Sequence, residues 1–149
     1  MNEYTKARSQ LILSSPFFGT LALRLRPIED SSIDTACTNG ECIKYKPKWF
    51  LKLRPHERIG LIAHEVMHVA LMHMLRRDHR DAFKWNVAAD YVINLALKKS
   101  NFILPHGELY DEQYDGMSTE EVYSKLPEDL GEDNGPAGII LLDGADPGG

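Results

Sequence analysis

The segment 54–77, RPHERIGLIAHEVMHVALMHMLRR, carries the pattern that decides the fold. Apolar residues within 59–75 occur on every side of an α-helix, and a helix of this kind lies in the centre of a domain. His64 and His68 are four residues apart, which places both side chains on one face of this helix. Because a buried imidazole needs a polar partner, the pair predicts a bound cation beside the helix.

Residues 64–68, HEVMH, form an H-E-x-x-H motif. Neutral imidazole is a good zinc ligand, and a catalytic zinc has three protein ligands and an open position for water. Bound zinc lowers the pKa of that water to about 7. Glu65 projects from the same side of the helix and can accept the water's proton. The alternative is that the two histidines are ordinary residues of a core helix.

A third ligand is predicted on a second helix, at residues 81–99. Asn86, Asp90 and Asn94 recur every four residues on its otherwise apolar surface. Asp90 is an anion among apolar neighbours and therefore needs a partner, and the two asparagines are expected to orient it. Asp90 is thus the predicted third ligand, beside the two motif histidines. The alternative is that Asp90 pairs with an arginine such as Arg76.

His73 is a weaker candidate for the third ligand. If the motif helix continues without a break, His73 lies about 180° around the axis from His64. The segment 69–72, VALM, contains no glycine that would let the chain turn. The sequence therefore predicts that His73 points away from the site, as a hydrogen-bonded core or surface histidine.

Two stretches predict a small β-sheet that covers the motif helix. Residues 20–26, TLALRLR, alternate leucine with other residues, which is typical of a strand with one apolar face. Residues 34–45 contain the dipeptide Asn39-Gly40, the strongest two-residue signal for a β-hairpin. Together with the helices, these strands predict an α+β domain.

A two-residue hairpin loop would place Cys37 directly opposite Cys42. We interpret the two thiols as small packing residues on one face of the hairpin. The alternative is a metal or redox role, because cysteine pairs in cytosolic proteins can serve either purpose.

The domain is expected to span residues 1–126. Residues 118–121, STEE, form a capping box that predicts a short helix ending near Leu126. Residues 127–149 are acidic and rich in glycine and proline, which predicts a mostly disordered tail or linker. Its abrupt end is consistent with a further domain downstream.

Charge and hydropathy limit the class of partner. The chain of 149 residues has a net charge of −5; residues 1–100 carry 16 Lys/Arg against 10 Asp/Glu, and residues 101–149 carry one Lys against 12 Asp/Glu. There is no basic stripe with interleaved aromatic residues, so nucleic acid is not the expected partner. No apolar run approaches the ~18 residues of a membrane span, and MNEYTK does not resemble a signal peptide. We therefore expect a cytoplasmic protein without a membrane partner.

Six segments together resemble a known family. They are SPFFG (15–19), RPIED (26–30), TNG (38–40), GLIAHEVMHVAL (60–71), WNVAADYVIN (85–94) and GMSTEEVY (116–123). In this order they resemble the bacterial and phage metallopeptidase domain that is often found ahead of a von Willebrand factor A-like domain. The resemblance covers about residues 4–126. It implies a zincin-like fold, a bound metal, a peptide or protein substrate, and a von Willebrand factor A-like domain or partner protein.

The gap from His68 to Asp90 is also similar to that in gluzincins, where the third ligand is a glutamate on the next helix. Aspartate is one methylene shorter than glutamate. The two helices must therefore lie closer together, or in a shifted register, for Asp90 to reach the metal.

The sequence favours zinc-dependent hydrolysis of a peptide bond in an α+β, zincin-like domain. In this hypothesis His64, His68 and Asp90 hold Zn²⁺, and Glu65 is the general base. The alternative is a non-catalytic zinc-binding module that interacts with the rest of a larger assembly. A metal-dependent nuclease is disfavoured by the acidic total charge.

Overall fold

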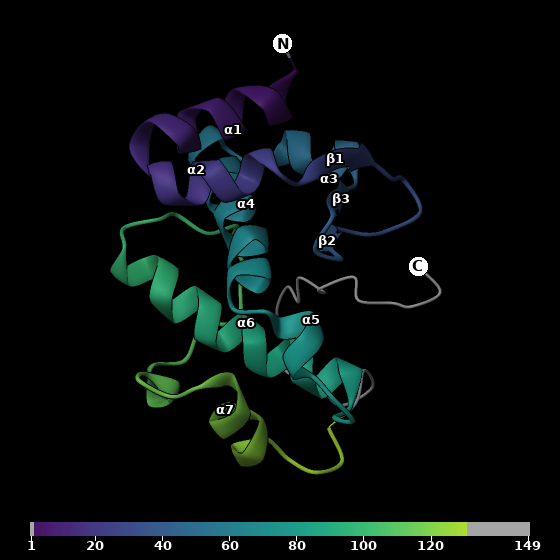
Figure 1. Ribbon diagram of the computed structural model, residues 1–149, viewed down its shortest axis with the longest axis vertical. Helices are drawn as coiled ribbons and strands as arrows, with labels where there is room; N and C mark the ends of the chain where they lie inside the picture. Colours follow the sequence, from purple (N-terminus) through teal and green to yellow (C-terminus); the bar gives the residue numbers. More distant parts are fainter. Residues whose placement is uncertain (1, 131–149) are drawn as a thin grey trace.

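The computed structural model describes residues 2–130. These residues form seven α-helices, one 3-10 helix and a three-stranded sheet, which confirms the α+β class (Figure 1). The helices are α1 (Glu3–Ser14), α2 (Pro16–Leu23), α3 (Pro47–Lys52), α4 (Pro55–Ala70), α5 (His73–Arg76), α6 (Ala82–Lys99), η1 (Glu112–Tyr114) and α7 (Thr119–Lys125). The strands are β1 (Arg26–Glu29), β2 (Ala36–Thr38) and β3 (Cys42–Tyr45). Most of the predicted tail 127–149 lies outside the described residues.

Helix α4 runs through the centre of the domain, as the sequence predicts (Figure 1). Helices α1 and α2 lie against one half of α4, and α6 crosses the other half. Strand β2 also contacts α4, and α7 packs on α6. The motif helix is therefore enclosed by elements from both ends of the described chain.

The start of α4 is fixed by contacts of Glu57. Its carboxylate accepts a hydrogen bond from the backbone N–H of Arg54 at 2.8 Å, which is the half of a capping box that the third helical residue supplies. The same carboxylate accepts from the N–H of His106 at 3.2 Å. One turn further on, a Cβ added at Gly60 would lie 2.0 Å from the carbonyl oxygen of Ile103. The segment that follows α6 thus crosses α4 in direct backbone contact.

Helix α4 ends at Ala70, and the prediction of an unbroken helix through residue 75 is wrong. Met72 adopts a left-handed conformation with φ of 56°, and the chain enters α5 at His73. Nη1 of Arg76 donates to the carbonyl oxygen of Leu71 at 2.8 Å, which satisfies a backbone group near the end of the helix. Because a side chain from α5 supplies this contact, the break needs no glycine or proline.

The predicted strand at residues 20–26 is also wrong. Residues as far as Leu23 belong to α2, and β1 begins later. Gly19 and Ala22 are buried, as residues three apart on one helical face, whereas Leu23 is 57% exposed. A Cβ added at Gly19 would lie 2.4 Å from the Cα of Ile12, so α2 packs closely on α1. This helix packing outweighs the alternation of leucines, which by itself fits a strand.

The sheet has the strand order β1-β3-β2. Strand β1 is parallel to β3, and β2 is antiparallel to β3. Strand β2 is therefore an outer strand of the sheet, and it also contacts α4.

The predicted hairpin is confirmed, but its loop is longer than predicted. Thr38 pairs with Ile43 and Cys37 with Lys44, so four residues, 39–42, separate the last pair of β2 and β3 in the hairpin, and Cys42, which pairs with β1, does not lie opposite Cys37. Oδ1 of Asn39 accepts hydrogen bonds from two backbone N–H groups of the loop, at 2.9 and 3.0 Å. These bonds stabilise a four-residue loop in place of the two-residue turn. Both cysteines are free thiols.

Helix α6 joins two apolar clusters. Ile93 and Leu97 belong to a cluster with α1, the sheet and α4, whereas Val87 and Leu95 belong to a cluster with α7. Asp90 lies on the strip of α6 between these two apolar faces. The polar strip is thus enclosed by apolar side chains on both sides. Within residues 2–130, no helix is long and apolar enough to cross a membrane.

Gly60→Ala is expected to destabilise the domain, although alanine normally favours a helix over glycine by about 1 kcal/mol. The added methyl group would meet the backbone carbonyl of Ile103. Overpacking of this kind costs about 1–3 kcal/mol. Urea unfolding in the presence of a chelator measures the free energy of unfolding.

The control is Gln10→Ala on the exposed side of α1, which should change the free energy of unfolding by less than about 0.5 kcal/mol. A Gly60→Ala protein as stable as the wild type would contradict the close contact between α4 and Ile103.

Candidate metal centre

The two motif histidines and Asp90 meet between α4 and α6. Nε2 of His64 lies 3.0 Å from Oδ1 of Asp90, and Nε2 of His68 lies 3.2 Å from the same oxygen. All three side chains are at most 1% exposed. Their possible ligand atoms lie within 4.8 Å of one another. The structure therefore brings together the three residues that the sequence predicts as metal ligands.

This donor set fits a small divalent cation such as zinc. Two imidazole nitrogens and one carboxylate oxygen are typical protein ligands of a catalytic zinc. Ligand atoms around a tetrahedral zinc, with bonds of about 2.0–2.1 Å, lie about 3.3 Å apart. The nitrogen–oxygen distances of 3.0 and 3.2 Å are close to that value. Asp90 reaches both histidines although it is shorter than glutamate, because α4 and α6 pack directly on each other.

Asn94 orients His64. Its Oδ1 lies 2.9 Å from Nδ1 of His64, and its amide nitrogen donates to the carbonyl oxygen of Leu109 at 2.7 Å. The second bond fixes which end of the amide faces His64. Since an amide oxygen only accepts, Nδ1 of His64 donates and Nε2 faces Asp90. The sequence-based expectation that Asn86 and Asn94 orient Asp90 is therefore wrong for Asn94.

Asn86 also differs from that expectation. Its side-chain oxygen is buried, and among the described residues this oxygen has no hydrogen-bond partner. Asn86 and Asn94 are thus not equivalent, because of the two only Asn94 forms a hydrogen bond with a motif histidine.

His73 lies beside His68, and the prediction that it points away is wrong. Nδ1 of His73 is 3.2 Å from Nδ1 of His68, and Nε2 of His73 is 2.8 Å from Oγ1 of Thr119. The left-handed turn at Met72 brings His73 back to the buried interior. Burial lowers the pKa of His73 to about 3, with smaller contributions from His68 and Arg76, so its ring is neutral.

Burial and ionic contacts act in opposite directions on Asp90. Burial by itself would raise the pKa of its carboxyl group, but the closeness of His64 and His68 outweighs this effect and lowers the pKa. Burial lowers the pKa of His64, and Asp90 offsets only part of that change. At neutral pH, Asp90 is therefore ionised and His64 is neutral, which are the forms that bind a metal.

Glu65 is fully buried on α4, and its charge acts on β2 and α1. Burial, and after it the charge of Glu65, raises the pKa of the Cys37 thiol in β2 to about 11. Burial is also the main cause that raises the pKa of Tyr4 in α1, and Glu65 contributes there as well. Glu65 therefore belongs to the buried side of α4 that α1 and β2 cover.

Thr119 contacts the site through His73, but the sequence gives no reason to identify it as a functional residue. It follows the first residue of a capping box, so a polar side chain there is already explained by the start of α7. Its partner His73 is 46 positions away, and no local pattern connects the two. Asn94 could be selected from the sequence, because it lies four residues after Asp90 on the same face of α6.

A protein-family profile described as "Putative metallopeptidase domain" matches residues 1–139. The chain belongs to this family. No curated protein and no solved structure matches the chain. Membership in a metallopeptidase family implies a metal ion, and the buried cluster of His64, His68 and Asp90 is a possible site for it.

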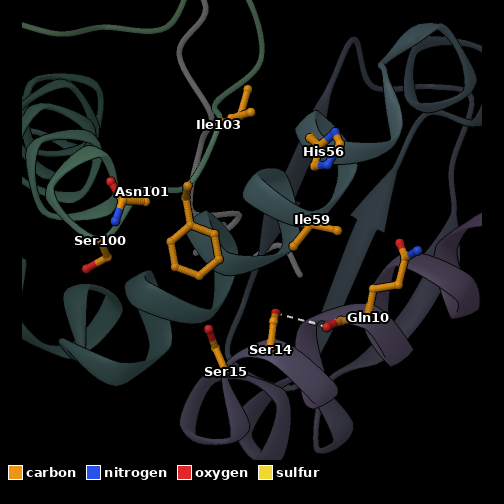
Figure 2. Close-up of a pocket in the computed structure, with 9 residues that line it drawn as sticks. Gln10, Ser14, Ser15, His56, Ile59, Ser100, Asn101 and Ile103 are labelled. Atoms are coloured by element: carbon orange, nitrogen blue, oxygen red, sulfur yellow. Dashed lines mark hydrogen bonds between the residues drawn. The ribbon is translucent and has the colours of Figure 1, made fainter.

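Figure 2 shows a surface pocket whose lining includes none of the three clustered residues. Its lining comes from α1, the first turns of α4 and the segment after α6: Gln10, Ser14, Ser15, His56, Ile59, Ser100, Asn101, Phe102 and Ile103. His56 is eight residues before His64, which corresponds to about 12 Å along the helix axis. The pocket therefore belongs to the opposite end of α4 and not to the candidate metal centre.

The Cys37 thiol is expected to react slowly with iodoacetamide at pH 8, because its pKa is raised to about 11 and the thiolate is the reactive form. The rate should rise as the pH approaches 11. Glu65→Gln removes a negative charge that disfavours the thiolate, so the pKa of Cys37 should fall and alkylation should be faster. A Cys42→Ala background leaves a single thiol for mass spectrometry.

Unfolded protein in urea serves as the control, and there both proteins should react at the same, faster rate. Equal alkylation rates for the folded wild type and the folded Glu65→Gln variant would contradict the closeness of Glu65 to β2.

Proposed function

We propose that the chain is a zinc-dependent peptidase, in which His64, His68 and Asp90 hold Zn²⁺ and Glu65 is the general base. The observation that carries this proposal is the convergence of two Nε2 atoms on one carboxylate oxygen, buried in a member of a metallopeptidase family. Three protein ligands leave a fourth position for water or substrate, as in catalytic zinc sites.

The residues of the site have distinct parts in the proposed reaction. Zinc, when bound, supplies Lewis acidity that polarises the scissile carbonyl and acidifies a water molecule. Glu65 accepts a proton from the attacking water at a carboxylate oxygen. As the bond between carbonyl carbon and amide nitrogen breaks, Glu65 donates this proton to the leaving amine. Asn94 keeps His64 oriented toward Asp90 during these steps.

The outer strand β2 is the proposed binding edge for the substrate. An extended peptide can add to an exposed sheet edge through main-chain hydrogen bonds. Strand β2 pairs with β3 on one side and contacts α4, and the charge of Glu65 is the second cause, after burial, of the raised pKa of Cys37. A peptide beside β2 would therefore pass close to the general base. This placement favours a peptide over a small-molecule substrate.

A second candidate function is a non-catalytic zinc-binding module within a larger assembly. The burial of the site favours it, because Glu65 and the three ligand side chains are at most 1% exposed. Structural zinc sites are closed in this way, whereas catalytic sites keep an accessible position. The partner that we propose for such an assembly is a von Willebrand factor A-like domain, on the basis of the sequence resemblance.

Protein produced with ample zinc is expected to retain about one zinc ion per chain after gel filtration, as measured by inductively coupled plasma mass spectrometry. His64→Ala and Asp90→Asn should lose most of this metal, because each removes a ligand. The control is His79→Gln, since the His79 side chain is 88% exposed and lies outside the cluster. A wild-type protein that binds no zinc under these conditions would refute the proposed function.

Glu65→Gln should retain the metal and lose hydrolysis. Removal of a general base typically lowers a rate by about 10²- to 10⁴-fold. The measurement is cleavage of a peptide library followed by mass spectrometry, together with zinc content of the same sample. Undiminished cleavage by the variant would show that Glu65 is not the general base. Bound zinc without Glu65-dependent cleavage by the wild type would favour the interaction module.

A further inference from the structure

A chain of hydrogen bonds leads from His68 to α7. It starts at Nδ1 of His68 in α4, passes through both ring nitrogens of His73 in α5, and ends at Oγ1 of Thr119. The two distances are 3.2 Å and 2.8 Å. All three side chains are at most 1% exposed, so water does not compete for these bonds. None of the atoms in the chain is a ligand atom of the proposed metal site.

The direction of these bonds follows from the part that His68 has in the site. If Nε2 of His68 binds a cation next to Asp90, the single ring proton of His68 is on Nδ1. Nδ1 then donates, so Nδ1 of His73 must accept. A neutral imidazole that accepts on one nitrogen carries its proton on the other. Nε2 of His73 therefore donates to the hydroxyl oxygen of Thr119.

His64 and His68 are held in different ways. His64 donates to the amide oxygen of Asn94, which can only accept. His68 faces an imidazole, which accepts only in one of its two tautomers. In that tautomer Nε2 of His73 carries the proton, and Oγ1 of Thr119 can accept it, so the buried N–H group keeps a hydrogen-bond partner. Thr119 thus acts on His68 without touching it.

Further contacts keep His73 and Thr119 in place. Nε1 of Trp85 donates to the carbonyl oxygen of His73 at 2.8 Å, and the two rings meet edge to face with centroids 5.8 Å apart. Arg76 in α5 forms an ion pair with Glu120, the neighbour of Thr119 in α7. Helix α5 is thereby attached to both α6 and α7. The position of Oγ1 depends on α7 being packed against the rest of the domain.

We propose that His73 and Thr119 are positioning residues of the metal centre, and that α7 controls metal affinity through them although it supplies no ligand. The packing of α7 places Thr119 where it accepts from Nε2 of His73, which leaves Nδ1 of His73 free to accept from Nδ1 of His68. This inference rests on the proposed function only in that His68 is a metal ligand. It does not depend on peptide hydrolysis.

Zinc affinity of the purified full chain tests the proposal, measured by competition with a chromophoric chelator. Thr119→Val keeps the size of the side chain and removes the hydroxyl group, so zinc affinity should fall about 10- to 100-fold. Thr119→Ser restores the hydroxyl group and should bind zinc within about threefold of the wild type. His79→Gln is the control for histidine loss at an exposed position and should bind zinc as the wild type does.

A second measurement needs no substitution. Long-range ¹⁵N–¹H correlation spectra of the zinc-loaded wild type report which ring nitrogen of each histidine carries the proton. The proposal requires the proton of His73 on Nε2 and the proton of His68 on Nδ1. A proton on Nδ1 of His73 would overturn the proposal, whether or not the variants fold.

The outcomes separate this proposal from the proposed function. Weaker zinc binding by Thr119→Val, with recovery in Thr119→Ser, supports the positioning chain even if no peptide is cleaved. Unchanged zinc affinity in Thr119→Val overturns the chain while leaving peptidase activity possible. Equal losses in Thr119→Val and Thr119→Ser also overturn it, because the hydroxyl group would then not be the determinant. A wild type that binds no zinc overturns both.

Discussion

The structure depends on one ionised carboxylate that is buried between two imidazoles. An ion transferred from water to a protein interior costs several kcal/mol unless nearby groups compensate for it. With the ring protons of His64 and His68 on Nδ1, both Nε2 atoms face Asp90 as lone pairs at 3.0 and 3.2 Å. A cation held by these three groups would supply the compensation. Because these three groups must lie close together, α6 packs closely on α4 at the position of Asp90. The same requirement explains the position of α6 between two apolar clusters, which exclude water and strengthen the polar contacts.

The two histidines are oriented by residues that are not themselves ligands. Asn94 holds His64, and the backbone of Leu109 fixes the amide of Asn94. His73 holds His68, and Thr119 provides the outer partner of His73. The region after α6 thus completes the site from outside, although composition gives it no chemical signature. Outer contacts of this kind commonly tune the affinity of a metal centre.

The sequence predicts those features that local patterns encode. The central helix follows from its apolar surface, the hairpin from Asn39-Gly40, and the closeness of Asp90 to the motif histidines from an anion on an apolar helix. The errors arise where distant contacts decide. Leu23 follows a strand period, yet the packing of Gly19 against α1 selects a helix. Met72 turns the chain without glycine, because a side chain from α5 satisfies the end of α4.

The early end of α4 changes how this arrangement would be recognised in other chains. His73 follows His68 by five residues, a step that a straight helix would place on a different face from the motif. A search limited to helical spacings would therefore pass over it. If a hydroxyl group in α7 matters only through His73, then positions 73 and 119 should vary together among relatives. A chain that loses one of the two residues should lose the other, or provide a carboxylate or carbonyl group beside its second motif histidine.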